Sequence, residues 1–115
     1  RTGAAERGRA IFFRTRANDG REIPEGNRCH ACHPPPLYTN RKSEGVATRG
    51  PLDTVDAFDT PHLAGVEGSA PFLHDGRAMT LEEIWTIHTP RDRHGVSNDM
   101  SKQQLNDLVE FLKTL

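Results

Sequence analysis

Three segments of the chain carry a helical pattern of apolar positions. The first covers residues 4–15, AAERGRAIFFRT, and predicts a helix with Ile11 and Phe12 buried. Gly8 lies one turn before Phe12. A residue without a side chain at that place indicates that another part of the backbone comes close to this helix.

A second helix is predicted to begin at Thr80, where Thr80 and Glu83 have the spacing of a capping box. Pro90 ends it, since the residue before a proline disfavours helical geometry. The apolar face has the spacing i, i+3, i+4, i+7 and consists of Leu81, Ile84, Trp85 and His88. We therefore expect His88 in the last turn, on the side that faces the interior.

The third predicted helix shows the strongest pattern in the chain. Ser101 and Gln104 form another capping box. A continuous apolar stripe then runs to the C-terminus through Leu105, Leu108, Val109, Leu112 and Leu115.

Between the first two helices lies a long stretch, residues 18–79, that is rich in Gly, Pro, Asp and Arg. It contains no convincing alternation of apolar and polar residues, so we expect an all-α chain with almost no sheet. A structureless loop of this length is unusual unless it wraps a ligand. A hydrophobic fraction of 34% and a mean hydropathy of −0.70 are also low, and a buried prosthetic group would supply the missing apolar volume.

Length and charge narrow the functional classes. The 115 residues correspond to a single domain, 1–115. A net charge of −1 argues against a nucleic-acid or membrane-surface partner. No apolar run approaches the roughly 18 residues of a membrane span. The chain begins at Arg1 without an initiator Met or signal peptide, so we expect a processed protein or a domain excised from a longer one.

Residues 29–33 form the motif C-x-x-C-H, which contains both cysteines of the chain. The thiols of Cys29 and Cys32 can add to the two vinyl groups of a haem, and His33 then supplies an axial nitrogen. A thioredoxin-like redox motif expects a helix after it, but three prolines follow at once. A closed zinc site usually needs a second cluster of Cys or His ligands, and the sequence contains none. We therefore predict one covalent haem c, with a redox dithiol, a zinc site or a disulfide as the alternatives.

From Cys29 onward the chain resembles the C-terminal haem domain of the bacterial dihaem cytochrome c peroxidase and MauG superfamily. The resemblance lies in residues 29–39, 58–66 and 70–77 continuing into 80–83, and the closing 107–115 is typical of class I cytochromes. It implies an all-α class I cytochrome c fold whose terminal helices cross beside the haem, with long loops wrapping it. It does not imply peroxidase activity, since those enzymes pair two haem domains.

The second axial ligand decides the mechanism. The candidates are Met79, Met100, His62, His74, His88, His94 or no ligand at all. In the family resembled, this ligand follows the His of the H-D-G motif by fourteen positions, which from His74 leads to His88. The helical pattern independently places His88 on the buried face, so we predict ligation by His33 and His88. The alternative is a hydrogen-bonded core histidine. Met100 is the runner-up, although it directly precedes the cap at Ser101 and suits apolar packing better.

Further residues are expected to surround the haem or to lie apart from it. The resemblance places His74 beside the haem, and Arg77 is expected to pair with a haem propionate or to remain exposed. Trp85 and Tyr38 are expected to pack against the porphyrin. We expect His30, His62 and His94 to point to solvent or to lie in turns. Met79 is expected to pack against apolar neighbours.

With two histidine ligands the iron has no open position, which favours single-electron transfer at low potential. We expect no catalytic residue, and redox partner proteins or a fused oxidoreductase domain as partners. The alternative is a peroxidase-like or ligand-sensing haem domain with an open or displaceable distal site, assisted by His74 or Arg77. A haem with a mainly structural role is a further alternative. Attachment of this kind takes place outside the cytoplasm, so we expect a periplasmic or otherwise exported location.

Overall fold

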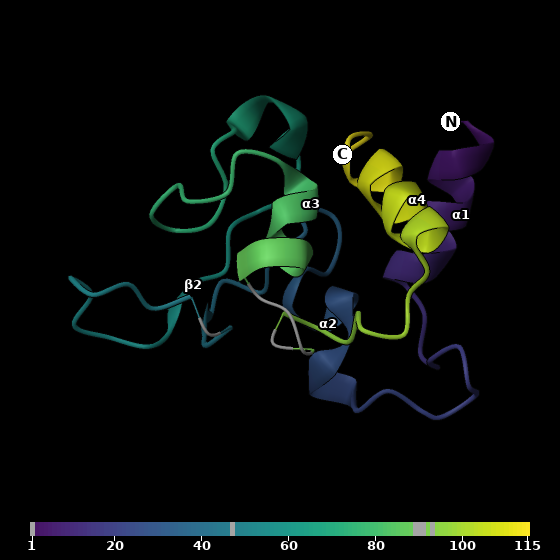
Figure 1. Ribbon diagram of the computed structural model, residues 1–115, viewed down its shortest axis with the longest axis horizontal. Helices are drawn as coiled ribbons and strands as arrows, with labels where there is room; N and C mark the ends of the chain where they lie inside the picture. Colours follow the sequence, from purple (N-terminus) through teal and green to yellow (C-terminus); the bar gives the residue numbers. More distant parts are fainter. Residues whose placement is uncertain (1, 47, 89–91, 93) are drawn as a thin grey trace.

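The computed structural model describes residues 2–46, 48–88, 92 and 94–115, and its path is shown in Figure 1. The α-helices are α1 (Gly3–Phe12), α2 (Cys29–Cys32), α3 (Leu81–Glu83) and α4 (Lys102–Leu112). Two 3₁₀ turns, η1 (Glu25–Asn27) and η2 (Val66–Ser69), and a π turn, η3 (Ile84–His88), complete the helical segments. The strands are β1 (Ser43–Glu44) and β2 (Phe58–Asp59).

The two strands correct the predicted fold class. β1 and β2 form an antiparallel sheet in which Ser43 pairs with Asp59 and Glu44 with Phe58. Isolated bridges also join residues 16 and 22, and residues 72 and 78. The chain is therefore a mixed protein, and the expectation of an all-α fold without sheet is wrong. Strands of two residues are too short to carry an alternating pattern, so the apolar spacing does not reveal them.

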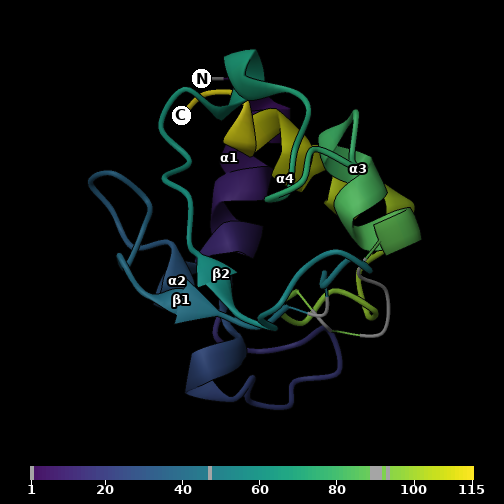
Figure 2. The same cartoon turned by 90° about the vertical axis from the view of Figure 1, so that its left-hand side faces the viewer.

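The two terminal helices pack against each other, as both views of the ribbon show (Figures 1 and 2). Thr2 caps α1 through its hydroxyl, and the predicted capping box begins α4 at Ser101. At the crossing, a Cβ on Gly8 would lie 1.9 Å from the carbonyl oxygen of Asp107. The close approach predicted at Gly8 is thus the point at which the backbone of α4 touches α1.

A buried carboxylate lies at the same crossing. Asp107 on α4 is only 3% exposed, and its Oδ2 accepts a hydrogen bond of 2.9 Å from Arg7 Nε on α1. This hydrogen bond lowers the pKa of Asp107, with Gln103 contributing in the same direction. The ion pair satisfies a charge that would otherwise be costly to bury.

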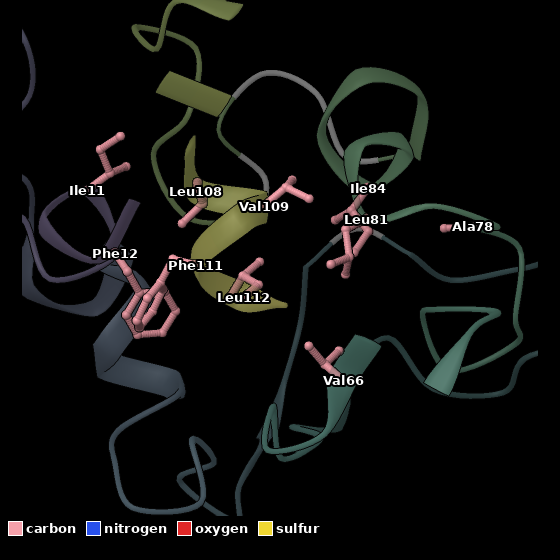
Figure 3. Packing of buried hydrophobic residues seen from close by; sticks show 10 residues of the cluster. All are labelled: Ile11, Phe12, Val66, Ala78, Leu81, Ile84, Leu108, Val109, Phe111 and Leu112. Atoms are coloured by element: carbon pink, nitrogen blue, oxygen red, sulfur yellow. The ribbon is translucent and has the colours of Figure 1, made fainter. Parts of the chain in front are cut away.

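The hydrophobic core is built around α4 (Figure 3). Side chains of α4 lie between those of α1 on one side and those of α3 and η3 on the other. The Phe12 and Phe111 rings pack with their centroids 5.4 Å apart. The buried cluster consists of Ile11, Phe12, Val66, Ala78, Leu81, Ile84, Leu108, Val109, Phe111 and Leu112.

The second predicted helix begins where expected but changes its winding. Thr80 and Glu83 form the capping box, and after a single α-helical turn the chain continues as the π turn η3. Leu81 and Ile84 are buried, whereas Trp85 and His88 are half-buried. A π turn uses i→i+5 hydrogen bonds, so side chains at its end do not keep the angular positions of an α-helix. The predicted orientation of His88 depended on that regular periodicity.

No helix in the described part of the chain is long and apolar enough to cross a bilayer.

Candidate functional site

The C-x-x-C-H motif is held on α2. Cys29 and Cys32 stand three residues apart on one helical turn, and both are free thiols. Arg28 fixes the start of the turn by donating from Nε to the carbonyl of Ile23 at 3.0 Å. The backbone N–H of His33 closes the turn on the carbonyl of Cys29 at 3.1 Å. Residues with this spacing project to the same side of a helix, so both sulfurs can reach one edge of a flat ligand.

The thiols do not have the acidity of a redox-active dithiol. Burial raises the pKa of Cys29 to about 11, although the nearby Arg14 acts in the opposite direction. Burial also raises the pKa of Cys32, and the carboxylate of Glu44 adds to the effect. Reactive C-x-x-C motifs instead contain a thiol whose pKa is lowered. This environment argues against the redox-dithiol reading of the motif.

His33 has a fixed tautomer. Its Nδ1 lies 2.7 Å from the carbonyl oxygen of Tyr38, which only accepts, so Nδ1 carries the proton and donates. Burial lowers the pKa of His33, while the carbonyls of Tyr38 and Pro61 oppose this change, and the ring is neutral at pH 7. Histidines that bind metals typically donate one ring N–H to a carbonyl in this way, which orients the ring.

α2 opens onto a cavity of about 550 Å³. Cys29, Cys32 and His33 line one side of it. The other walls are mostly apolar and come from α1, β2, η2, α3, η3, α4 and the loops that follow β2 and η2. They include Phe12, Phe58, Leu63, Val66, Phe72, Leu73, Leu81, Ile84, Trp85, Leu108 and Leu112. The volume falls within the usual range for sites that hold a small molecule or cofactor.

These residues fit a haem. Two thiols on one turn, a histidine with a fixed tautomer and a largely apolar cavity meet the requirements of covalent attachment and axial ligation. A buried imidazole nitrogen that lacks a hydrogen-bond partner, on His94, adds a second possible ligand. The sequence motif and the cavity thus point to the same group.

His94 was expected at the surface or in a turn, but it lines the cavity. Its Nδ1 is buried and has no hydrogen-bond partner among the described residues. Burial, followed by the charge of His33, lowers the pKa of His94 to about 4, so the ring is neutral at pH 7. Trp85 donates from Nε1 to the carbonyl of His94 at 3.2 Å. Sequence spacing gave no signal for His94, because its burial comes from contacts between distant segments.

His88, the predicted second ligand, lies on η3 and is half-buried. It is not among the described residues that line the cavity. Ligation by His88 therefore stays a prediction from the family position and the helical pattern.

His74 lines the cavity from the opposite loop, and both of its ring nitrogens face polar atoms. Nε2 lies 2.8 Å from Oδ2 of Asp53, and Nδ1 lies 3.5 Å from the hydroxyl of Thr48. The ring stacks on Phe58 with centroids 3.6 Å apart. The pKa of Asp53 is lowered, first by the backbone N–H of Gly50 and then by His74. His74 is therefore a fixed part of the cavity wall.

Arg77 is engaged by a neighbouring carboxylate. Its Nε donates to Oδ2 of Asp75 at 2.9 Å, and this pairing lowers the pKa of Asp75 to about 2. Ligand atoms of Asp53, His74 and Asp75 lie within 4.8 Å of one another, and Arg77 supplies positive charge beside them. Arg77 is not among the described cavity-lining residues, so its pairing with a propionate stays a prediction.

The remaining sequence candidates lie outside the cavity or at its rim. Met79 is 64% exposed, whereas Met100 packs against the hydrophobic core, and neither is found among the lining residues described. His62 lines the cavity but is exposed, and its Nδ1 donates to the carbonyl of Ala64 at 3.2 Å.

Of the aromatic residues near the motif, His30 lies differently from what was expected. The Nδ1 of His30 is buried, and the ring packs 5.5 Å from Phe13 instead of pointing to solvent. Tyr38 packs against Phe12 at 5.7 Å and joins the core, while its carbonyl holds His33. Trp85 does line the cavity.

Comparison with known proteins gives two curated relatives, and no family model matches the chain. The gamma subunit of hydrazine synthase from Kuenenia stuttgartiensis is 41% identical over 75 residues, covering 62% of this chain and 21% of the relative. Cytochrome c551 peroxidase from Nitrosomonas europaea is 26% identical over 113 residues, covering 84% of this chain and 33% of the relative. The chain thus spans a third or less of each curated relative.

Two solved structures are similar over almost the whole chain. Hydrazine synthase from Kuenenia stuttgartiensis, under xenon pressure, superposes with a TM-score of 0.79 at 25% identity, covering 99% of this chain and 46% of the other. A MauG-like protein associated with microbial copper homeostasis gives a TM-score of 0.71 at 21% identity, covering 100% and 44%, and this likeness concerns the fold alone.

Together, the site and these relatives indicate a haem-related redox protein. More particularly, the peroxidase relative fits the superfamily that the motifs of the sequence resemble, and the MauG-like structure agrees with it in fold alone.

Proposed function

We propose that this chain binds one haem c covalently through Cys29 and Cys32, with His33 as an axial ligand, and that it transfers single electrons. The observation that carries the proposal is the position of the C-x-x-C-H turn, which opens onto a largely apolar cavity of about 550 Å³. A cytochrome needs covalent anchors, an axial nitrogen and an apolar enclosure, and this place in the fold offers all of them.

Each part of the site has a physical role in this proposal. When bound, the haem supplies an iron centre that alternates between the ferric and ferrous states. α2 holds the two thiols toward one edge of the cavity, and the carbonyl of Tyr38 orients His33 by accepting its Nδ1 proton. The apolar walls exclude water, which limits the change in solvation when the charge of the site changes.

The second axial ligand is a histidine in this proposal, and the site is closed to external ligands. Two imidazoles fill both axial positions and favour ferric iron more than a methionine does, so the potential lies below that of a His/Met cytochrome. Neither methionine is a described cavity-lining residue, which supports a nitrogen ligand. The sequence names His88 for this role.

A second candidate function is a catalytic haem with an open or displaceable distal site. The hydrogen-bonded pair of His74 and Asp53 favours it, because an imidazole oriented by a carboxylate beside the cavity can accept or donate a proton. This function requires an iron that binds external ligands, whereas the proposed carrier does not.

The location and partners form part of the same proposal. Haem attachment through this motif takes place outside the cytoplasm, so the chain would act in the periplasm or an equivalent compartment. Its partners would be redox proteins or a fused oxidoreductase domain.

Expression with a c-type maturation system tests attachment and electron transfer together. We expect a mass increase of one haem that survives acid–acetone extraction and a reversible one-electron redox titration. The double variant Cys29→Ser and Cys32→Ser should lose the covalent haem, whereas His62→Ala, changed at an exposed position at the rim, should keep it. Haem that extracts freely from the unmodified protein, or a centre that cannot be cycled, would contradict the proposal.

A further inference from the structure

The described part of the cavity wall holds three carboxylates, and one of them differs from the other two in burial. The three belong to Glu44, Asp59 and Asp92. Asp59 and Asp92 are exposed, whereas Glu44 is half-buried. Water screens an exposed charge strongly, so the charge of Glu44 acts most strongly on a group inside the cavity.

The sheet of β1 and β2 directs the Glu44 side chain toward the cavity. Glu44 on β1 pairs with Phe58 on β2, and directly opposed residues of an antiparallel pair have their side chains on the same face. Both residues line the cavity. Ser43 and Asp59 form the other pair of the sheet, and both are exposed. The side chain of Glu44 is therefore placed on the sheet face that contributes to the cavity wall.

Asn40 fastens this carboxylate to the attachment turn. Its backbone N–H donates to the carbonyl of Cys32 at 2.8 Å, and its Nδ2 donates to Oε1 of Glu44 at 3.1 Å. The pKa of the Cys32 thiol is raised first by burial, and then by the charge of Glu44 and a hydrogen bond to its carboxylate. Glu44 thus lies beside the thiol that would form one of the two bonds to the haem.

No cation in the described part of the chain neutralises this carboxylate. None of the ion pairs there involves Glu44. Arg28 is the only Lys or Arg among the described lining residues, and its guanidinium is already paired with Glu22 at 3.2 Å. Formation of the thioether removes the S–H of Cys32, which leaves the neutral amide of Asn40 as the described partner of Glu44.

A charge at this place acts on the redox equilibrium of the haem. Ferric haem carries more positive charge than ferrous haem, so a nearby negative charge stabilises the ferric form and lowers the reduction potential. The apolar walls strengthen this effect, because they keep water from screening the charge. We therefore propose that Glu44 lowers the reduction potential of the haem through an uncompensated negative charge beside Cys32; the inference rests on the haem attachment proposed above. The effect does not depend on which residue is the second axial ligand.

Redox titration of the haem-loaded protein and its Glu44→Gln variant tests this role. The Gln amide has nearly the same size, and its oxygen can still accept from Asn40, so the substitution removes the charge and keeps the contact. At a fixed ambient potential, Glu44→Gln should raise the ratio of ferrous to ferric haem by about threefold or more. Glu44→Asp keeps the charge and should stay closer to the unmodified protein.

Asp59→Asn is the matched control, because it removes a carboxylate from the paired strand at an exposed position. Its effect on the ratio should be clearly smaller than that of Glu44→Gln. The optical spectra of all variants should match that of the unmodified protein, since a charge effect leaves the axial ligands in place. If Glu44→Gln does not load haem, Glu44→Ala is the second charge-removing variant, and it should shift the ratio in the same direction.

The inference is overturned if the charge-removing variants leave the potential unchanged or lower it, or if Asp59→Asn shifts it as much as Glu44→Gln does. A higher potential with an altered spin state would also overturn it, by assigning Glu44 a structural role. In each of these cases covalent attachment and electron transfer would still stand. Absence of covalent haem from the unmodified protein would overturn the proposed function itself.

Discussion

At the residue scale, the candidate site is organised by which side-chain atoms are already paired. The Nδ1 proton of His33 is held by a backbone carbonyl, and the ring of His74 is held by Asp53. The Nδ1 of His94 is buried with no partner in the described part of the chain. These pairings come from long-range packing, so they distinguish histidines that the sequence could not rank.

One ion pair at this scale supports the segment that carries His94. Arg14 donates from Nη1 to Asp99 at 2.9 Å and from Nη2 to the carbonyl of Val96 at 2.9 Å. Asp99 also accepts from the backbone N–H of Asn18 at 2.7 Å. The side chains of Arg14 and Asp99 are 13% and 25% exposed, which is less than for most ion pairs at a surface.

We predict that Asp99→Asn lowers the free energy of unfolding by about 1 kcal/mol at pH 7, because a charged hydrogen-bond acceptor is lost. Urea denaturation measures the difference. Asp19→Asn is the matched control, since Asp19 pairs with Arg21 in a more exposed position and should change stability little. Equal effects of the two substitutions would contradict this account of the pair.

The same pair has a defined pH dependence. Arg14 lowers the pKa of Asp99 below its ordinary value, so the folded state holds this proton less readily than the unfolded state. The stabilisation is present above the unfolded pKa of about 4 and is lost as the pH falls through the lower folded pKa. The stability difference between the parent protein and Asp99→Asn should therefore shrink on acidification below about pH 4.

At the scale of the elements, the crossing of α1 and α4 depends on one position without a side chain. Gly8 is buried, and an added Cβ would meet the carbonyl oxygen and carbon of Asp107 at 1.9 and 2.6 Å. These are backbone atoms, which cannot move aside as the end of a flexible side chain can. A methyl group there would push the two helices apart.

We predict that Gly8→Ala costs about 1–3 kcal/mol of stability, as is typical when a group is forced into a packed contact. Gly3→Ala is the control in the same helix, where a Cβ would meet only the guanidinium of Arg7 at 3.5 Å. That change should be neutral or slightly stabilising. Thermal denaturation of the two variants gives the comparison, and similar midpoints would be evidence against the close approach.

The sequence predicted the elements whose signals are local. Capping residues and an apolar stripe located α4. Gly8 and its apolar neighbours indicated where another part of the backbone comes close to α1. The sheet of β1 and β2 was missed because its strands have two residues each and their pairing joins distant positions. The π turn was missed because its hydrogen-bond register leaves no mark in the apolar spacing.

For the candidate site, the sequence predicted the attachment motif but not the full set of surrounding residues. C-x-x-C-H is readable because all its groups lie within five residues of one turn. The burial of His94 depends on Trp85 and on the segment around Asn27, which lie far from each other in the chain. A periodicity argument could select His88 but had no means to find His94.

At the scale of the whole molecule, the cavity lies between two unequal parts. On one side α1 and α4 pack against each other (Figure 2), and on the other side residues of β1 and β2 and of the loops beside them line the cavity. The only described strands in these loops are two residues long. A bound haem would provide the apolar surface on which they rest, so their order should depend on it more than that of the helices.

We predict that the variant without covalent haem, Cys29→Ser with Cys32→Ser, loses protection of the loop amides while α1 and α4 stay protected. Hydrogen exchange in residues 41–46 and 48–75 should speed up by about tenfold or more, which corresponds to at least about 1.4 kcal/mol of lost local stability. The amides of α4 provide the internal reference. Uniform loss of protection in both parts would show that the haem holds the entire fold together.

The proposed function requires a closed, six-coordinate haem that transfers electrons. The most direct test is the optical spectrum of the unmodified protein in the ferric and ferrous states, followed by addition of carbon monoxide. We predict a low-spin spectrum without a far-red sulfur band and no binding of carbon monoxide by the ferrous form. A high-spin ferric spectrum, or ready binding of carbon monoxide, would contradict the closed site and support the catalytic or ligand-sensing function instead.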